Sequence, residues 1–404
     1  MLPQARCAAT PRSNRTDYVE ETEAGFDSNA GASAALQRSE RCNLCTRMRS
    51  VMPAAMALLL LLPAHAANTQ EPTKRIWLGG SWSNLADVSA QTGAIGRSDL
   101  TAVSDSSLYV YDYQDHVLKA FTLDGKPKWK FGKDGMRAGE FHVVTSLEVD
   151  SRGQVWASDP IVGRVTIVSA SGQLVRTIEG LEYPWRIVPR ADGTFWGWIQ
   201  ARQADGTLRG EVRQYDSTGA HFSRVSISVA LDTINSLTGT ASLASVGANG
   251  LAMTYFWSDR FVLIDGKTRA ARTYRGVERR EFPSVGSRST GMTVGGKAVT
   301  RMLIDSAAKL GALSGAVDGD RLYVLFGTGP RSASGVRRTV DTYRIPNGQY
   351  LGSYLLPEDA LLLRVHNGMF VASVDKPIPA VKIWTWIPRP SGLAKAGHPT
   401  GKSN

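Results

Sequence analysis

Arginine and aromatic side chains recur in the predicted turns, and they are the residues of this chain that are best suited to bind a ligand. Guanidinium groups bind carboxylates or phosphates through paired hydrogen bonds, and aromatic faces stack on sugars, peptides or cations. The candidate ligand-binding residues are His142, Trp185, Arg186, Trp257, Arg260 and Arg331. Together they predict an anionic or glycan-like ligand. The alternative is that the same side chains serve only the packing of strands and turns.

No pattern in the sequence predicts catalysis or a metal centre. The histidines are widely separated and lack the H-E-x-x-H spacing of zinc hydrolases. Gly286-Ser287-Arg288-Ser289 lacks the second glycine of a nucleophile elbow. Cys42-x-x-Cys45 has no strand and helix beside it, so we assign it no redox or zinc role. We predict no metal site and no cofactor, and the catalytic residues of any enzyme activity are unknown.

A repeat organises the elements that must position these side chains. Gly125, Gly172, Gly219 and Gly266 stand 47 residues apart, and each follows alternating apolar residues typical of a strand. A period of about 40 to 50 residues indicates a stacked or radial repeat protein, because one unit cannot bury its apolar face without neighbours. Each unit contains strands ended by Gly, Asp or Ser, which is the pattern of an antiparallel meander.

Six copies of the unit predict an all-β fold, a six-bladed β-propeller of four-stranded antiparallel blades, over residues 67–390. Radial closure removes the exposed edges that an open array would leave. Residues 75–78 are the predicted latch that pairs with the last blade. Residues 276–311 are predicted to be an insertion between blades four and five, forming either a basic lid over the channel or a solvated loop. Residues 391–404 are predicted to be a disordered tail.

The predicted ligand site lies on one face of this ring. The loops that join the second strand of a blade to the third, and one blade to the next, gather there around the central channel. Asp112 and Asp159 end strands beside these loops, and we expect them to accept hydrogen bonds from their own turns. Trp196 and Trp198 alternate along one strand, as do Trp384 and Trp386, so one member of each pair is expected in the core.

The segment 48–66 has the features of a secretory signal peptide. Arg49 precedes an apolar stretch with five consecutive leucines, and Ala64-His65-Ala66 offers small residues for cleavage near Ala66/Ala67. We therefore expect a periplasmic or secreted protein. Residues 1–47 are polar and lack a hydrophobic period, and either they precede the true start at Met48 or Met52, or they form a disordered extension.

Charge and hydropathy limit the partners. Lys and Arg outnumber Asp and Glu by 47 to 36, a net charge of +11, but no run of five basic residues occurs. We therefore expect no nucleic-acid partner. The apolar stretch is shorter than the ~20 residues of a membrane span, so no stable membrane insertion is expected. The predicted protein is a monomer.

Two stretches carry a family resemblance. Gly132-Lys-Asp-Gly135, Gly153-Gln-Val-Trp156-Ala-Ser-Asp159 and Gly163-Arg164-Val165 resemble an NHL repeat. Leu322 to Gly327 and Asp341 to Gly348 resemble the TolB-like six-bladed propellers of exported bacterial proteins. The resemblance implies a propeller in which Arg164 pairs with an aspartate of its blade. Propellers serve as binding modules, hydrolases and lyases alike.

These observations lead to one function and one alternative. We expect an exported, non-catalytic propeller that binds a protein segment or an anionic or glycan ligand on its loop face. The alternative is a metal-assisted lactonase-like hydrolase, or a polysaccharide lyase, acting in the central channel. Calcium is the metal that the hydrolase would require, because its site uses oxygen ligands.

Overall fold

The structure of the chain is a computed structural model, which describes residues 74–202, 208–225, 227, 240–294, 297–304, 307–330, 333–345 and 347–389. The predicted extension 1–47, signal peptide 48–66 and tail 391–404 lie outside these residues. The chain divides into two units, Met1–Ala67 and Asn68–Asn404, and only the second is described below. Its described residues form strands and turns. The described part of the chain contains no helix that is long and apolar enough to cross a bilayer.

The strands of the second unit form six four-stranded antiparallel blades, as the repeat predicted. Blade one contains β2 (Leu100–Val103), β3 (Leu108–Asp112), β4 (Val117–Phe121) and β5 (Pro127–Phe131). Blade two contains β6 (Ser146–Val149), β7 (Val155–Asp159), β8 (Arg164–Val168) and β9 (Leu174–Ile178). Blade three contains β10 (Pro184–Pro189), β11 (Phe195–Arg202), β12 (Leu208–Tyr215) and β13 (His221–Val225).

The second half of the ring has the same strand order. Blade four contains β14 (Ala241–Val246), β15 (Gly250–Tyr255), β16 (Arg260–Ile264) and β17 (Ala271–Arg275). Blade five contains β20 (Ala312–Asp318), β21 (Arg321–Phe326), β22 (Thr339–Arg344) and β23 (Gln349–Leu355). Blade six contains β24 (Leu362–His366), β25 (Met369–Val374), β26 (Ala380–Pro388) and β1 (Gly80–Ser89).

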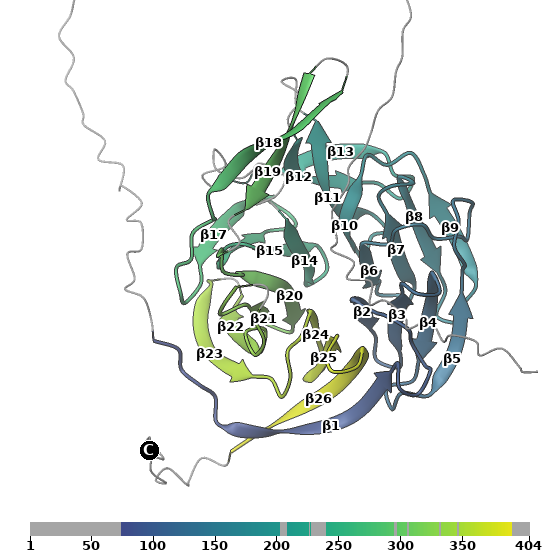
Figure 1. Cartoon of the computed structure of the whole chain (residues 1–404). Helices are drawn as coiled ribbons and strands as arrows, with labels where there is room; N and C mark the ends of the chain where they lie inside the picture. Colours follow the sequence, from purple (N-terminus) through teal and green to yellow (C-terminus); the bar gives the residue numbers. More distant parts are fainter. Residues whose placement is uncertain are drawn as a thin grey trace, which may run out of the picture. The chain divides into compact units, whose positions relative to one another are not determined.

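The first strand of each blade lies at the centre of the ring. These inner strands contact one another in the order β2, β6, β10, β14, β20, β24, and β24 contacts β2 again, so the circle is closed (Figure 1). The repeated glycines make the tight turns between outer strands: Gly125 and Gly172 have φ angles of 88° and 84°, which L side chains rarely adopt. The inner strands therefore line a channel, and the turns lie on its two faces.

The core consists of six apolar clusters, one at each interface between neighbouring blades. Trp196 and Trp198 both pack between blades three and four, and Trp384 is buried between blades five and six with Trp386 partly buried against it. The expectation of one core tryptophan in each pair was wrong for Trp196 and Trp198, which are both buried, whereas Trp384 is the buried member of its pair. Residues two apart in a strand face the same side of the sheet, so both members reach the same interface.

The ring closes through β1, and the prediction that residues 75–78 pair with the last blade was wrong. β1 pairs with β26 from Gly80↔Pro388 to Ser89↔Ala380. Its Ala86 and Val88 are buried between blades six and one, an apolar contact that the shorter run 75–78 does not offer. Trp77 instead forms a parallel bridge with Ser353 at the outer edge of blade five.

An extra hairpin stands between blades four and five, where the sequence predicted an insertion. β18 (Val285–Val294) and β19 (Lys297–Ile304) pair with each other alone in a two-stranded antiparallel sheet. The end of the predicted insertion is followed at once by the inner strand β20, which begins at Ala312. Figure 1 shows this hairpin projecting from the ring of blades.

Candidate functional site

Two adjoining cavities lie along the inner strands. The larger, of about 200 Å³, is lined by β2, β6, β14, β20 and β24, and its polar lining side chains are Glu148, Ser245, Arg364 and His366. The smaller, of about 120 Å³, shares Glu148 and Ser245 and adds residues from the end of β10. The lining residues come from the middle and second half of the inner strands. The cavities therefore face the turns that join first and second strands, which we call the inner-turn face.

Arg364 forms hydrogen bonds with two other blades in this region. It starts on β24 of blade six, and its Nε donates to the carbonyl of Thr101 at 3.0 Å. Its Nη2 reaches blade two, donating to the carbonyl of Leu147 at 3.1 Å and to Oε1 of Glu148 at 2.6 Å. A single guanidinium thus joins three blades around the channel, and no described residue accepts a hydrogen bond from its Nη1.

The electrostatics of the channel are set by two arginines and one carboxylate. Burial raises the pKa of Glu148, although the charges of Arg364 and Arg186 oppose that rise. Burial also lowers the pKa of Arg186, whose Nη1 donates to the backbone carbonyls of Thr145 and Trp185. Since one carboxylate faces two guanidiniums, one positive charge in the channel lacks a carboxylate partner among the described side chains.

A polar rim surrounds the cavity at the inner-turn face. His366 Nε2 lies 2.7 Å from Oδ1 of Asp105, and the side-chain amide of Asn367 donates to the same oxygen at 2.9 Å. The carboxylate of Asp318 accepts from the backbone N–H groups of Asn367 at 3.0 Å and Gly368 at 2.9 Å. These contacts join the turns of blades one, five and six, so the rim around Arg364 is held in place from three sides.

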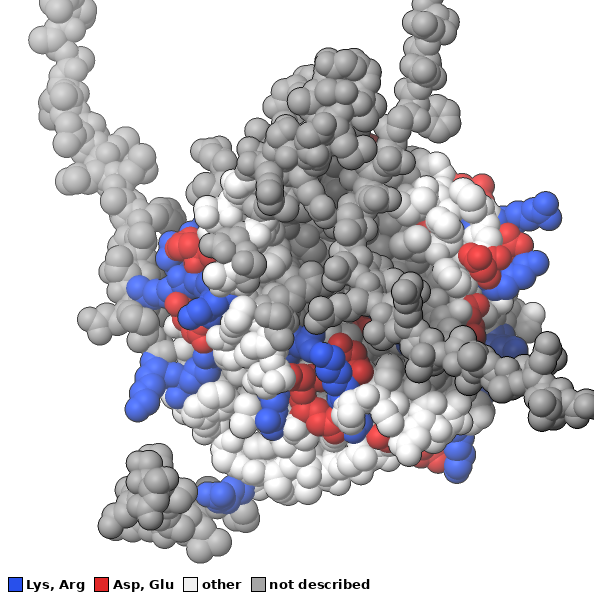
Figure 2. All heavy atoms as spheres, viewed as in Figure 1, with Lys and Arg blue, Asp and Glu red and all other residues white. Residues whose placement is uncertain are grey.

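The arrangement suits the binding of a small anion. Nη1 of Arg364 has donors left for a carboxylate or phosphate, and such charge-assisted hydrogen bonds are the strong ones. Basic and acidic side chains are interspersed on the face shown in Figure 2, so the net positive charge does not gather there into one patch. Within the described residues, no group of three or more His, Cys, Asp or Glu side chains could hold a metal ion.

The predicted site residues lie at different places in the ring. Arg186 belongs to the channel charges, whereas the adjacent Trp185 packs partly buried against the core between blades three and four. His142 is exposed, and its backbone N–H donates to Asp159 at 2.7 Å. Arg331 lies outside the described residues.

Trp257 and Arg260 flank the turn between β15 and β16. Trp257 stacks edge-on against Phe256, with ring centroids 5.0 Å apart, and Arg260 forms an ion pair with Glu281. The assignment of these two residues to a binding site stays a prediction.

Sequence reasoning missed Glu148, Arg364 and His366. Glu148 lies on an inner strand of only four residues, too short to show a period, and the inner strand of blade six was not recognised. The available signal was a charged residue inside an apolar run, Leu361-Leu-Leu-Arg364-Val, which is unusual for a buried strand.

The turn aspartates behave as predicted. Asp112 accepts from the backbone N–H of Gln114 in its own turn at 3.0 Å, and Asp159 accepts from that of Val162 at 3.3 Å. Each also accepts from the connection that leads into its blade, Asp112 from Gly96 and Arg97 and Asp159 from His142 and Val143. Arg164 does not pair with an aspartate. Its guanidinium donates to the carbonyls of Met136 at 2.9 Å and Glu140 at 2.7 Å, because the loop between blades one and two folds over it.

Asp259, beside the turn that carries Arg260, makes stability depend on pH. Its side chain is buried, and burial raises its pKa to about 6, although the backbone N–H groups of Arg280 and Arg279 oppose that rise. A raised pKa means that folding favours the protonated form, so its contribution to stability is present at acid pH and is lost as pH rises through about 6.

We expect Asp259→Asn to raise the free energy of unfolding by about 2 kcal/mol at pH 7.5, and to change it little near pH 4. Melting temperatures of both proteins between pH 4 and 8 measure this. A variant that is less stable at pH 7.5, or equally shifted at every pH, would contradict the assignment of Asp259 as a buried acid with a raised pKa.

The solved structures that are similar to this chain share little sequence identity with it. No family profile and no curated protein sequence matches the chain. Among solved structures it is similar to streptogramin B lyase, with 10% identity over 76% of this chain and 98% of that one at a TM-score of 0.44. A virginiamycin B lyase from Staphylococcus aureus is 12% identical over 76% of this chain and 100% of that one, at a TM-score of 0.45. The WD40 repeats of RRP9 are 11% identical over 78% of this chain and 97% of that one, at a TM-score of 0.44.

Proposed function

We propose that the protein is a non-catalytic binding propeller that holds a small anionic group, a carboxylate or a phosphate, in the channel cavity at the inner-turn face. The observation that carries the proposal is Arg364. Its guanidinium is fixed by acceptors from blades one and two, yet Nη1 remains for a ligand in a cavity of about 200 Å³. Because the group is held in advance, little conformational entropy is lost on binding.

The sign of the charge favours an anion over a cation. Glu148 is already hydrogen-bonded to Arg364, and Arg186 adds a second positive charge to the same channel. Arg186 donates to backbone carbonyls, which leave its charge in place. The low dielectric of the channel strengthens the attraction of both guanidiniums for an anion.

The proposal includes export and family type. The apolar segment after Arg49 supports secretion or a periplasmic location, and the Gly-rich turns of blade two support an NHL-like or TolB-like propeller. The presence of six complete blades is consistent with a binding scaffold of that kind. Nothing specific in the site favours the hydrolase or lyase alternative, so we propose no reaction.

Glu148→Gln tests the proposed function. Removing the competing negative charge is expected to tighten the binding of inorganic phosphate or citrate by about fivefold or more, because the amide can still accept from Arg364. Isothermal titration calorimetry at low salt measures both affinities. Glu182→Gln is the matched control, since Glu182 is exposed and pairs with Arg213 outside the channel. Equal or weaker binding by Glu148→Gln would refute the channel as the anion site.

A further inference from the structure

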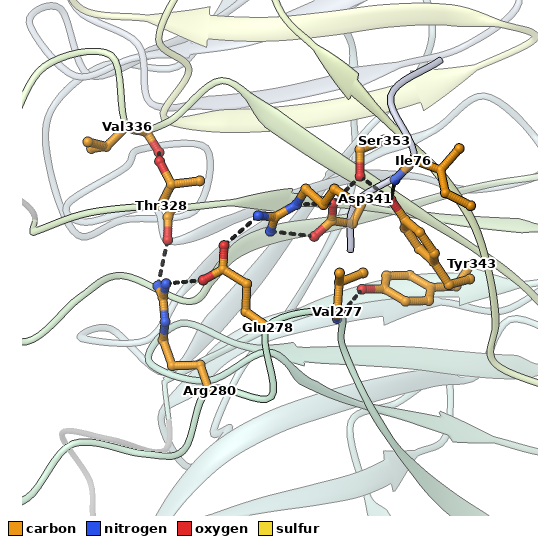
Figure 3. A network of polar contacts seen from close by, with 12 residues as sticks. Ile76, Val277, Glu278, Arg280, Thr328, Val336, Asp341, Tyr343 and Ser353 are labelled. Carbon is orange, nitrogen blue, oxygen red and sulfur yellow. Dashed lines mark hydrogen bonds and ion pairs between the residues drawn. The ribbon is translucent and has the colours of Figure 1, made fainter. Parts of the chain in front are cut away.

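Arg75 occupies a site built by other segments of the chain. Its Nε and Nη2 donate to the two carboxylate oxygens of Asp341 on β22, at 2.9 and 3.0 Å, and its Nη1 pairs with Glu278 in the connection after β17. This is the paired, fork-shaped contact by which carboxylates recognise guanidinium groups. Figure 3 shows Asp341, Glu278 and Arg280 in one continuous network of polar contacts.

The site is shaped for a planar cation. Arg75 lies over the ring of Phe326, 5.0 Å from its centroid, and Arg280 lies 4.7 Å from the same ring. Asp341 is buried, and its Oδ1 also accepts from the hydroxyl of Ser353 at 2.5 Å, so the carboxylate is fixed independently of Arg75. Burial tends to lower the pKa of Arg75, but Asp341 and Glu278 outweigh that effect and raise it, which keeps the guanidinium charged.

The backbone after Arg75 pairs with the edge of blade five through a parallel bridge between Trp77 and Ser353. The N–H of Leu78 donates to the carbonyl of Ser353 at 2.9 Å, and the N–H of Ser353 donates to the carbonyl of Ile76 at 2.8 Å. Gly352 permits the close approach, because a Cβ there would lie 2.8 Å from the Leu78 side chain. Ile76 and Trp77 are 57% and 53% exposed. The segment is therefore anchored chiefly by Arg75 and Leu78.

We propose that the edge of blade five is a recognition site for an arginine carried on an extended peptide, and that residues 75–78 fill this site within the chain. Strand addition supplies the backbone hydrogen bonds, and the pocket of Asp341, Glu278 and Phe326 selects the guanidinium. When Arg75 is absent, two carboxylates face the single charge of Arg280, and the site attracts another guanidinium. This site is separate from the channel and has the opposite charge preference.

Chemical rescue tests the pocket. Arg75→Ala is expected to lower the melting temperature by roughly 5–10 °C, because it leaves Asp341 buried without its partner. Millimolar ethylguanidinium should restore several degrees in a saturable manner, whereas ethylammonium should restore less. If Arg75→Ala does not fold alone, recovery of folded protein only in the presence of ethylguanidinium gives the same answer, and failure of that recovery refutes the site.

The control is the double variant Arg75→Ala/Asp341→Asn, which should show no rescue. Equal effects of ethylguanidinium on the wild type, Arg75→Ala and the double variant would overturn the pocket. A second experiment tests whether a separate peptide can occupy the edge of blade five. A labelled peptide of residues 73–79 is added to the variant Arg75→Ala/Leu78→Ser, in which the chain's own segment has lost both of its anchoring side chains. Fluorescence anisotropy should show that the peptide binds, and that its affinity falls at least about tenfold when lysine replaces the arginine. Absence of binding, or equal affinity of the two peptides, would overturn the proposal that the edge recognises an arginine on an extended peptide.

Discussion

Replacing Arg364 by methionine is expected to lower the free energy of unfolding by about 3–5 kcal/mol, because Glu148 is then buried without its charged partner. The side chains of Arg364 and Glu148 are only 12% and 17% exposed, so water that enters the cavity can compensate only part of the lost contact. The backbone carbonyls of Thr101 and Leu147 lose their donor at the same time. Urea unfolding followed by tryptophan fluorescence measures the change.

Two further variants give this expectation its controls. Glu148→Met/Arg364→Met should recover most of the lost stability, since apolar residues can replace a buried ion pair at little cost. Arg344 is exposed at the end of β22, so Arg344→Met should change the free energy of unfolding by no more than about 0.5 kcal/mol. A single variant as stable as the wild type would show that Arg364 does not join the blades as described.

Val88→Asp is expected to lower the free energy of unfolding by at least about 4 kcal/mol, because it places an unpaired carboxylate in the interface that closes the ring. Val88 is 1% exposed on β1 and lies opposite Val381 of β26. The apolar contact that it loses holds blade six to blade one. Thermal unfolding and limited proteolysis at the ring closure both report this loss.

Leu85→Asp is the matched control for the closure. Leu85 belongs to the same strand and is 47% exposed, so the new carboxylate remains solvated. We expect a change of about 0.5 kcal/mol or less. If the two aspartate variants were equally destabilised, β1 would not be buried on one face in the way that its pairing with β26 requires.

The architecture was predictable because its signals are local. The turns at Gly125 and Gly172 need positive φ angles, and the strands before them alternate apolar residues, so spacing alone revealed the repeated hairpins. Six copies then required closure, since an open array would expose its strand edges. The outer strands and the position of the extra hairpin followed directly.

The channel was less accessible to sequence reasoning. Inner strands such as β2 and β6 span four residues each, too few to show a period, and they follow irregular connections. Glu148 and Arg364 are 216 residues apart in the chain, and only ring closure brings them within hydrogen-bonding distance. Arg186 lies close enough to Glu148 for its charge to act on that carboxylate, but the sequence placed the predicted site at the other face of the ring.

The closing strand could not be placed for a related reason. The sequence predicted a strand at residues 75–78 and none at 80–89, and nothing local distinguishes pairing with blade five from pairing with blade six. Which blade each segment joins depends on partners more than 260 residues away in the chain. Arg75 pairs with Asp341, and β1 pairs along the length of β26. Such long-range pairing is set by burial and charge in the assembled ring.

Anomalous diffraction from crystals soaked in selenate tests the proposed anion site most directly. We expect a selenium peak inside the cavity of about 200 Å³, within hydrogen-bonding distance of the Arg364 guanidinium and strengthened in the Glu148→Gln variant. A cavity without selenate, with the anion bound instead at the turn of Trp257 and Arg260, would contradict binding in the channel.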